Sequence, residues 1–350
     1  MQMMELPVSY NQRYLATSTG TVLVWPFLNG DKGEGPYELF LDTNSLSKSK
    51  WFGELPGDMR SRCVINPWPA LLEQWLSNPV FRANPEQRIN AMIEPFADMG
   101  AAFREHFARQ QVKVLIKNEA ALKSQFSLIM PYVAIMKSTL AERVRAEEAL
   151  QRLEALSKLD IPRFTSAMML SAMTTLLKSK QATKLEGDAN TAFSYLESFF
   201  AFQPGKKDEQ DFINVPYLRN RAGDLSLWLC LSLLSQQGYS FVGSPAIVTG
   251  DKALHRLIVR AIPPVLRLDR KAAFGLAPDG LPPHMAEQIA GILAQVQVRG
   301  DITGEEGLTR VTNLFEHAKT CCAEERERQA LDEIYADWWR PGFGKEIDLS

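Results

Sequence analysis

The sequence has little of what marks membrane, secreted or zinc-stabilised proteins. The longest apolar run, residues 225–234, is about half of the ~20 residues that a membrane-spanning helix needs. The N-terminus lacks the basic, apolar and small-residue pattern of a secretion signal. Only 4 of the 350 residues are cysteine, and they do not provide two ligand pairs at zinc spacing. We therefore expect a soluble, cytoplasmic protein.

The four cysteines fit this expectation. Cys63 and Cys230 each lie alone in an apolar segment, where a free thiol is usually buried. Cys321 and Cys322 are adjacent and follow His317 by four and five positions. Because no second ligand pair accompanies them, we interpret them as small side chains on a helix and not as a zinc site.

Several common catalytic motifs are also absent. The chain has no G-x-x-x-x-G-K-[ST], no G-x-G-x-x-G, no H-E-x-x-H and no G-x-S-x-G, which removes local support for the usual nucleotide, zinc-protease and serine-hydrolase sites. Its 4 histidines are scattered and do not indicate a catalytic triad. The net charge of −2 does not point to a nucleic-acid or membrane partner for the whole chain.

The hydrophobic share of 45% is enough for a sizeable core, and its pattern changes along the chain. Apolar, β-branched segments predict strands at residues 20–28, 37–41, 62–66 and 245–249. Residues 85–202 are helical in pattern, residues 203–210 resemble a linker, and further helices are predicted at 284–297 and 304–339. Met168, Met169 and Met173 form a stripe that we interpret as core.

These elements predict an α/β fold in which a mainly parallel sheet is flanked by helices, because right-handed βα crossovers place successive strands in one sheet. An all-α insertion interrupts this domain, and helices follow it at the C-terminus. The expected division is a first half of the core at residues 1–78, an insertion at 79–207, a second half at 208–262 and an extension at 263–350.

Four acidic residues lie at the ends of predicted elements. Asp42 ends the strand YELFL and Asp251 follows the strand AIVT, and the carboxyl ends of strands are where sites form in α/β sheets. Asp224 is expected in the first turn of an apolar helix, and Glu73 on the short helix after the strand RCVIN. Carboxylates, waters and a substrate phosphate are the ligands that Mg²⁺ prefers, although each acid taken alone could be a helix cap.

Four segments that contain these acids resemble a known family. ELFLDTNSL, VINPWPALLEQW, RNRAGDLSLWLCLSLL and PAIVTGDKAL are similar, in the same order, to the four acidic elements of PIN-like nucleases of the PIN/FEN-like superfamily. The resemblance covers about the first 80 residues and residues 220–260. It departs from the compact family pattern in the 151 positions between Glu73 and Asp224 and in the extra C-terminal helices.

The resemblance implies a PIN-like fold and a role for each matched residue. Asp42, Asp224 and Asp251 would ligate one or two Mg²⁺ or Mn²⁺ ions, and Glu73 would assist directly or through water. Asn44 would orient Asp42, and Thr249 would hold the last acidic loop. The family uses no organic cofactor and cleaves RNA in most cases and structured DNA in some.

Basic residues near these acids are candidates for phosphate contacts. The nearest in sequence are Arg219, Arg221, Lys252 and His255, each of which could equally form a structural ion pair. From Pro79 to Lys207 the chain has 18 Lys and Arg against 13 Asp and Glu, a net charge of +5, whereas the remainder carries −7. The insertion could therefore guide a nucleic acid, or its charges could only solvate helices. Its candidate residues are Arg104, Arg109, Lys113, Lys117 and Lys123.

We thus expect a metal-dependent endonuclease that favours RNA over DNA and leaves a 5′-phosphate and a 3′-hydroxyl. Because such a nuclease must be restrained in the cell, we expect a conditional one, such as a toxin or a phage-defence effector, although the length argues against the compact toxins of the family. We also expect a regulatory protein partner on the helical insertion and no membrane partner. The alternative is a PIN-like scaffold that binds a protein or nucleic acid without cutting it. A third interpretation is a helical assembly protein whose acids are only caps.

Overall fold

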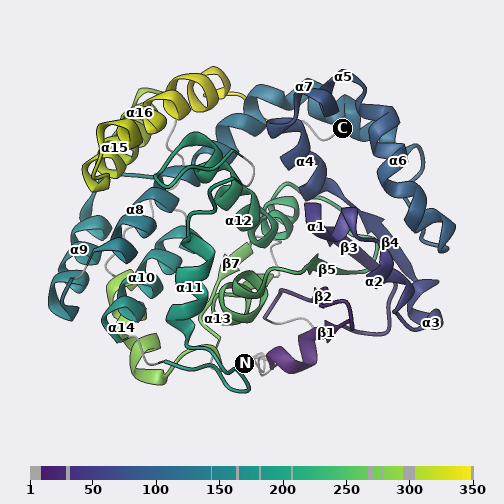
Figure 1. Ribbon diagram of the computed structural model, residues 1–350, viewed down its shortest axis with the longest axis horizontal. Coiled ribbons are helices and arrows are strands. Elements are labelled where there is room, and N and C mark those ends of the chain that lie inside the picture. The colour runs from purple at the N-terminus through teal and green to yellow at the C-terminus, as the bar shows by residue number, and fades with distance from the viewer. Residues whose placement is uncertain are drawn as a thin grey trace. The chain divides into compact units, whose positions relative to one another are not determined.

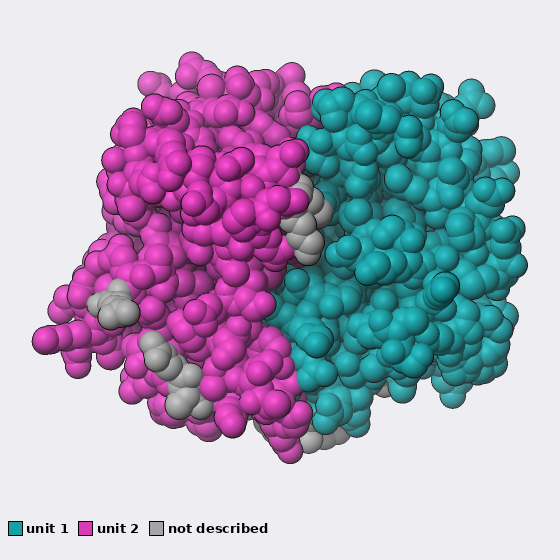
Figure 2. All heavy atoms as spheres, viewed as in Figure 1, with its two compact units in different colours: residues 1–118, 226–277, 348–350 teal, residues 119–225, 278–347 magenta. Residues whose placement is uncertain are grey.

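The computed structural model describes residues 9–28, 32–142, 144–162, 165–180, 183–205, 208–266, 272–277, 279–294 and 304–347. Within these residues the protein is mixed α/β, as the sequence predicts. The chain divides into two compact units, coloured separately in Figure 2. Unit 1 contains residues 1–118, 226–277 and 348–350, and unit 2 contains residues 119–225 and 278–347.

Unit 1 contains a five-stranded sheet with the strand order β1-β2-β5-β3-β4 (Figure 1). The strands are β1 (Tyr14–Ala16), β2 (Val22–Val24), β3 (Tyr37–Leu41), β4 (Cys63–Asn66) and β5 (Ser244–Thr249). β3 pairs in parallel with β4 and β5, whereas β2 pairs antiparallel with β1 and β5. The prediction of a mainly parallel sheet therefore holds for β4, β3 and β5 only. The short turn between β1 and β2 allows only an antiparallel pair.

All five residues of β3 are buried. It lies between two parallel neighbours, which explains why YELFL lacks the alternation of polar and apolar residues of a half-exposed strand. Gly243 begins the approach of β5 to β3 with φ = 102°. A Cβ atom at this position would collide with the carbonyl oxygen of Pro36, so this approach requires glycine.

Glu38 is an acidic residue in the middle of the buried strand β3, and the sequence pattern does not indicate which groups pair with it. Its carboxylate accepts hydrogen bonds from Asn66 Nδ2 (2.8 Å), the Tyr239 hydroxyl (2.5 Å) and the backbone N of Val242 (2.8 Å). Arg104 completes the network with an ion pair at 3.3 Å. Because a buried carboxylate is tolerated only when paired and hydrogen-bonded, Arg104 has a structural role here. The expectation that Arg104 guides phosphates is thus not supported.

The predicted helical block is present. Its helices are α5 (Pro79–Ala83), α6 (Pro85–Asp98), α7 (Phe107–Ser127), α8 (Met130–Ala141), α9 (Ala146–Lys158), α10 (Thr165–Lys180) and α11 (Ala192–Phe200). In unit 2, α10 contacts α8, α9, α11 and the later helix α14 (Pro283–Ala294). Met168, Met169 and Met173 on α10 are all buried, which confirms their interpretation as core. Of the predicted helix at 284–297, residues 295–297 lie outside the described residues.

The helix that carries Asp224 begins earlier than predicted. α12 spans Val215–Gln236, so Asp224 lies in its third turn and not in its first. The start is set by Asn214, whose side chain accepts a hydrogen bond from the backbone N of Tyr217 at 2.9 Å, with Pro216 directly after the first helical residue. Asparagine before a helix and proline in its first turn are both typical start signals, and the helix continues through Gly223 despite the cost of about 1 kcal/mol.

The C-terminal residues form three segments where one helix over 304–339 was predicted. These are α15 (Gly304–Cys321), α16 (Glu325–Glu333) and the π-helix η3 (Ile334–Trp339). α15 contacts α8 in unit 2. The predicted boundaries lie at residues 79, 208 and 263, whereas the compact units divide after residues 118, 225 and 277. None of the described helices is long and apolar enough to span a lipid bilayer.

Candidate functional site

The chain order and the spatial order of the parallel strands differ at the site. From β3 the chain continues to β4 on one side, and it later returns to β5 on the other side of β3. The strand order therefore switches between β3 and β5, and such a switch point, at the carboxyl ends of the strands, is where open α/β sheets bind ligands. Asp42 directly follows β3, and Asp251 lies two residues after β5. The sequence predicted both positions correctly.

A single hydroxyl group connects these two loops. Thr249 Oγ1 donates a hydrogen bond to Asp42 Oδ2 at 2.7 Å and accepts one from the backbone N of Asp251 at 3.0 Å. Thr249 is completely buried, which fixes its side chain at the end of β5. The predicted role of Thr249 in holding the last acidic loop agrees with these contacts.

The carboxylate of Asp42 is also fixed by the helix that it caps. The backbone N of Ser45 donates to Asp42 Oδ1 at 2.5 Å, at the start of α1 (Thr43–Ser47). Ser45 is held in turn by its own hydroxyl, which donates to the carbonyl oxygen of Val248 at 3.1 Å. Asn44 is exposed, and among the described contacts its side chain makes no hydrogen bond to Asp42. The role of Asn44 in orienting Asp42 stays a prediction, whereas the backbone N of Ser45 is the contact that fixes the capping carboxylate.

Glu73 approaches the same place from α4 (Trp68–Ser77). The Thr43 hydroxyl, next to Asp42 in the chain, donates to Glu73 Oε2 at 2.6 Å. α1 and α4 are in contact, and both contact β3 (Figure 1). The sequence predicted the helix that carries Glu73, but it gave no sign of the hydrogen bond from Thr43 that holds the carboxylate.

The pKa of Asp42 is raised above its ordinary value, mainly by burial. The negative charge of Glu73 raises this pKa further, whereas the hydrogen bonds from Ser45 and Thr249 lower it. In the described part of the chain, no lysine or arginine forms an ion pair with Asp42. Because the negative charge of Glu73 disfavours the ionised form of Asp42, a proton or a metal ion bound to Asp42 would be favourable.

The residues present fit a hydrated magnesium ion better than a fully protein-bound one. Among the residues that the structure describes, no three His, Cys, Asp or Glu side chains are grouped as a metal site. Mg²⁺ commonly takes one or two carboxylates and keeps several waters, and Asp42 with Glu73 provides such a pair. Asp251 caps the helical segment that follows it, because its Oδ1 accepts a hydrogen bond from the backbone N of Leu254 at 2.7 Å.

In unit 1, hydrogen bonds connect the loop of Asp42 with the carboxylate of Glu73 and with the backbone of Asp251. Asp224 is partly buried and lies among the residues of unit 2, so its role as a ligand stays a prediction from the sequence.

The predicted phosphate-contacting residues have different environments. His255 is 2% exposed, lies 3.2 Å from the Tyr10 hydroxyl through Nδ1 and stacks on Tyr14. Arg221 is 4% exposed and pairs with Glu209 at 3.3 Å. Burial in these contacts removes both residues from the set that could reach a phosphate. Lys252 is exposed beside Asp251, and Arg219 lines a pocket in unit 2.

Comparisons with protein-family models, curated proteins and solved structures gave no match. The resemblance to PIN-like nucleases therefore rests on the four sequence segments, and the chemistry of the site is inferred from its own geometry.

Proposed function

We propose that the protein is a metal-dependent endonuclease with a PIN-like core that acts on RNA in preference to DNA. The observation that carries this proposal is the connection of Asp42 to Asp251 through the Thr249 hydroxyl, at the point where the strand order switches. The presence of Glu73 beside Asp42 supplies the second carboxylate. The four segments similar to PIN-like nucleases supply the chemical class.

In this proposal Asp42 and Glu73 hold a divalent ion, Mg²⁺ or Mn²⁺, and Asp251 contributes through water. The ion would supply Lewis acidity and lower the pKa of a bound water. Asp42 is positioned for this task because both of its oxygens are already fixed by neutral donors. Each oxygen keeps a further lone pair for a cation. Asp224 is the fourth acid of the family pattern, and its contribution can be measured with Asp224→Asn.

Thr249 is a positioning residue in this account. Its hydroxyl donates a hydrogen bond to the carboxylate of Asp42 and accepts one from the backbone N–H of Asp251. Removing the hydroxyl would free both loops, so the metal affinity and the reaction rate should both fall. Replacement by serine keeps the donor and the acceptor and should retain most of the activity.

A basic face on α7 is the proposed contact with the nucleic-acid backbone. Arg109, Lys113 and Lys117 are exposed and recur at steps of four residues, which places them on one side of the helix at a spacing of about 6 Å. No acidic residue occurs between Arg109 and Lys117. Phosphates neutralised by such a face would release counterions and make binding dependent on salt.

The biological role that we propose is that of a conditional nuclease in defence or stress, restrained by a partner until needed. The large helical block between the two halves of the core provides the surface for such a partner. The competing interpretation is a scaffold that binds without cutting, and the two differ in metal binding and in turnover.

The test is cleavage of labelled single-stranded RNA, structured RNA and DNA by the full chain. Each substrate is incubated with Mn²⁺, Mg²⁺ or EDTA, beside Glu94→Gln as a control at an exposed acid of α6. Cleavage that needs metal, is unaffected by the control and is fastest on RNA would support the proposal. If no substrate is cut and calorimetry detects no Mn²⁺ binding, the scaffold interpretation replaces it.

A further inference from the structure

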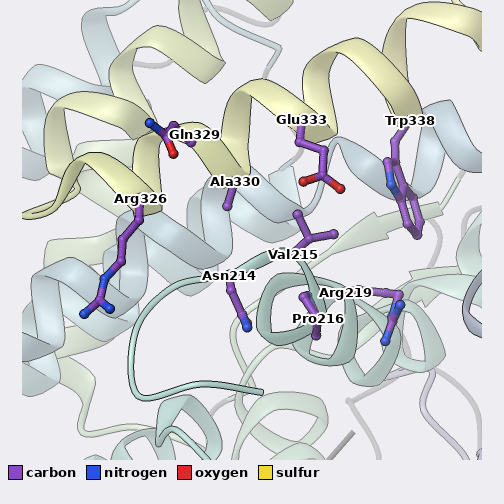
Figure 3. Close-up of a pocket in the computed structure, with 9 residues that line it drawn as sticks. All are labelled: Asn214, Val215, Pro216, Arg219, Arg326, Gln329, Ala330, Glu333 and Trp338. Carbon is purple, nitrogen blue, oxygen red and sulfur yellow. The ribbon is translucent and has the colours of Figure 1, made fainter. Parts of the chain in front are cut away.

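Unit 2 contains a pocket whose lining residues are separate from Asp42 and Asp251, the acids that follow β3 and β5. It lies between the first turns of α12 and the helical segment formed by α16 and η3 (Figure 3). Its volume is about 500 Å³, within the range of small-molecule sites in proteins. Polar side chains from both segments line it, so the pocket is suited to a charged or hydrogen-bonding ligand.

Two guanidinium groups line the pocket. Figure 3 draws Arg326 of α16 and Arg219 of α12 on opposite sides of the pocket. Glu333 lies farther along α16 than Arg326 and lines the pocket as well. Arg326 is held in place, because its guanidinium lies 3.7 Å from the ring centroid of Phe212 and its Nε donates to Glu324 at 2.5 Å. A guanidinium whose position is fixed loses little conformational entropy when a ligand binds. It can donate two parallel hydrogen bonds to two oxygens of one phosphate group.

The start of α12 forms part of the same wall. Val215 and Pro216, its first two residues, line the pocket beside Asn214. The positive end of the dipole of this 22-residue helix therefore lies at the pocket, and such helix starts attract phosphate groups. The arginine side chains, of which Arg326 is paired with Glu324, and the helix start are two sources of positive potential at one cavity.

The other lining residues favour a ligand that is more than an inorganic anion. Trp338 lines the pocket with an indole whose position is fixed by Phe126, at a centroid distance of 6.3 Å, and by Lys123. Trp338 is only 9% exposed, so its indole offers a planar base an apolar edge to lie against. The exposed carboxylate of Glu333 can accept hydrogen bonds but would repel a bare phosphate. A ligand with an anionic end and a planar end that donates hydrogen bonds would fit both the arginine side chains and the pair of Trp338 and Glu333.

From these features we infer that the pocket in unit 2 binds a nucleotide, with the phosphates at Arg326 and the α12 start and the base near Trp338 and Glu333. This site is separate from the proposed nuclease function and would exist even if the chain did not cleave RNA. It would make the protein responsive to a soluble nucleotide.

The test is calorimetric titration of the full chain with ATP, GTP, adenosine, guanosine and inorganic pyrophosphate, in EDTA and without RNA. The variants are Arg326→Gln and Glu333→Gln, both at exposed positions, with Lys345→Gln as a control that removes an exposed charge in the same unit. We expect at least one nucleotide to bind tighter than its nucleoside and tighter than pyrophosphate. Arg326→Gln should weaken nucleotide binding about tenfold, and Lys345→Gln should leave it unchanged.

Glu333→Gln separates the two ends of the ligand. It should weaken nucleotide binding, because an acceptor for the base or the ribose is lost, and strengthen pyrophosphate binding, because a repulsive charge is removed. The inference is overturned if no nucleotide binds, if pyrophosphate binds as tightly as the nucleotides, or if Arg326→Gln and Lys345→Gln have equal effects.

Discussion

Asp42→Asn is expected to stabilise the metal-free protein while it abolishes cleavage. Burial and the nearby Glu73 raise the pKa of Asp42 in the folded protein, so the ionised form destabilises the fold relative to the unfolded chain. Each pKa unit between the two states corresponds to about 1.4 kcal/mol. Asparagine removes the charge and keeps an oxygen for the backbone N of Ser45, but its amide cannot accept the hydrogen bond from Thr249. At pH 8 the removal of this charge is expected to outweigh the lost hydrogen bond, so the free energy of unfolding should be higher for the variant than for the parent.

The sign of the pH dependence follows from the direction of the shift. A carboxyl group with a raised pKa in the folded state binds its proton more tightly there, so the native state gains relative stability below that pKa and loses it as the pH rises above the ordinary value of 3.8. The difference between Asp42→Asn and the parent should therefore be positive at pH 8 and fall toward zero or below as the pH approaches 4.

Urea denaturation in EDTA at pH 4.5, 6 and 8 measures this difference. Glu94→Gln is the matched control, since Glu94 is exposed and its neutralisation should shift the curves equally little at each pH. Adding Mn²⁺ at pH 8 should stabilise the parent and leave Asp42→Asn unchanged. A variant that is less stable than the parent at pH 8, or a difference that does not vary with pH, would refute the reasoning.

Three further predictions concern Thr249, Glu38 and the basic face of α7. Thr249→Val should lower the free energy of unfolding by about 1–3 kcal/mol, because two partly buried groups lose their hydrogen bond to the Thr249 hydroxyl. Thr249→Ser should cost less, and thermal denaturation compares the two variants. Glu38→Gln should destabilise by about 3 kcal/mol in urea titrations, since it leaves Arg104 without its buried partner, while loss of the exposed Asp58–Arg62 pair should cost under about 1 kcal/mol. Neutralising the basic face of α7 should reduce the salt slope of RNA binding by about 2, and neutralising three exposed lysines of unit 2 should not. The first set is Arg109, Lys113 and Lys117, and the control set is Lys158, Lys180 and Lys184.

Positions at strand ends were the most predictable part of the site. The apolar runs YELFL and AIVT fix β3 and β5, and the acids that follow them are placed by parallel pairing with no further information. Thr249 could be included because it ends the same strand. Asp224 could not be placed in this way, since the residues that start α12 lie ten positions earlier, at Asn214, and the helix passes through Gly223.

Contacts between distant segments were not predictable from periodicity. Glu38 is paired with Arg104 and Tyr239, which are 66 and 201 positions away, and a buried glutamate in a strand pattern gives no indication of its partners. The exposure of the basic residues near the acids was not predictable either. Lys252 is exposed, whereas Arg221 and His255 are buried, and the sequence does not distinguish them. The pocket in unit 2 combines residues 214–219 with residues 326–338, and no local pattern connects them.

The most direct test of the nuclease proposal is the rate of RNA cleavage in Mn²⁺ by the parent and by the double variant Asp42→Asn/Asp251→Asn, with folding of both checked by circular dichroism. The proposal predicts cleavage by the parent that stops in EDTA and a rate for the folded double variant that is lower by at least about 100-fold, as expected when transition-state charge stabilisation is removed. Equal rates for the two proteins, or cleavage that persists in EDTA, would contradict it.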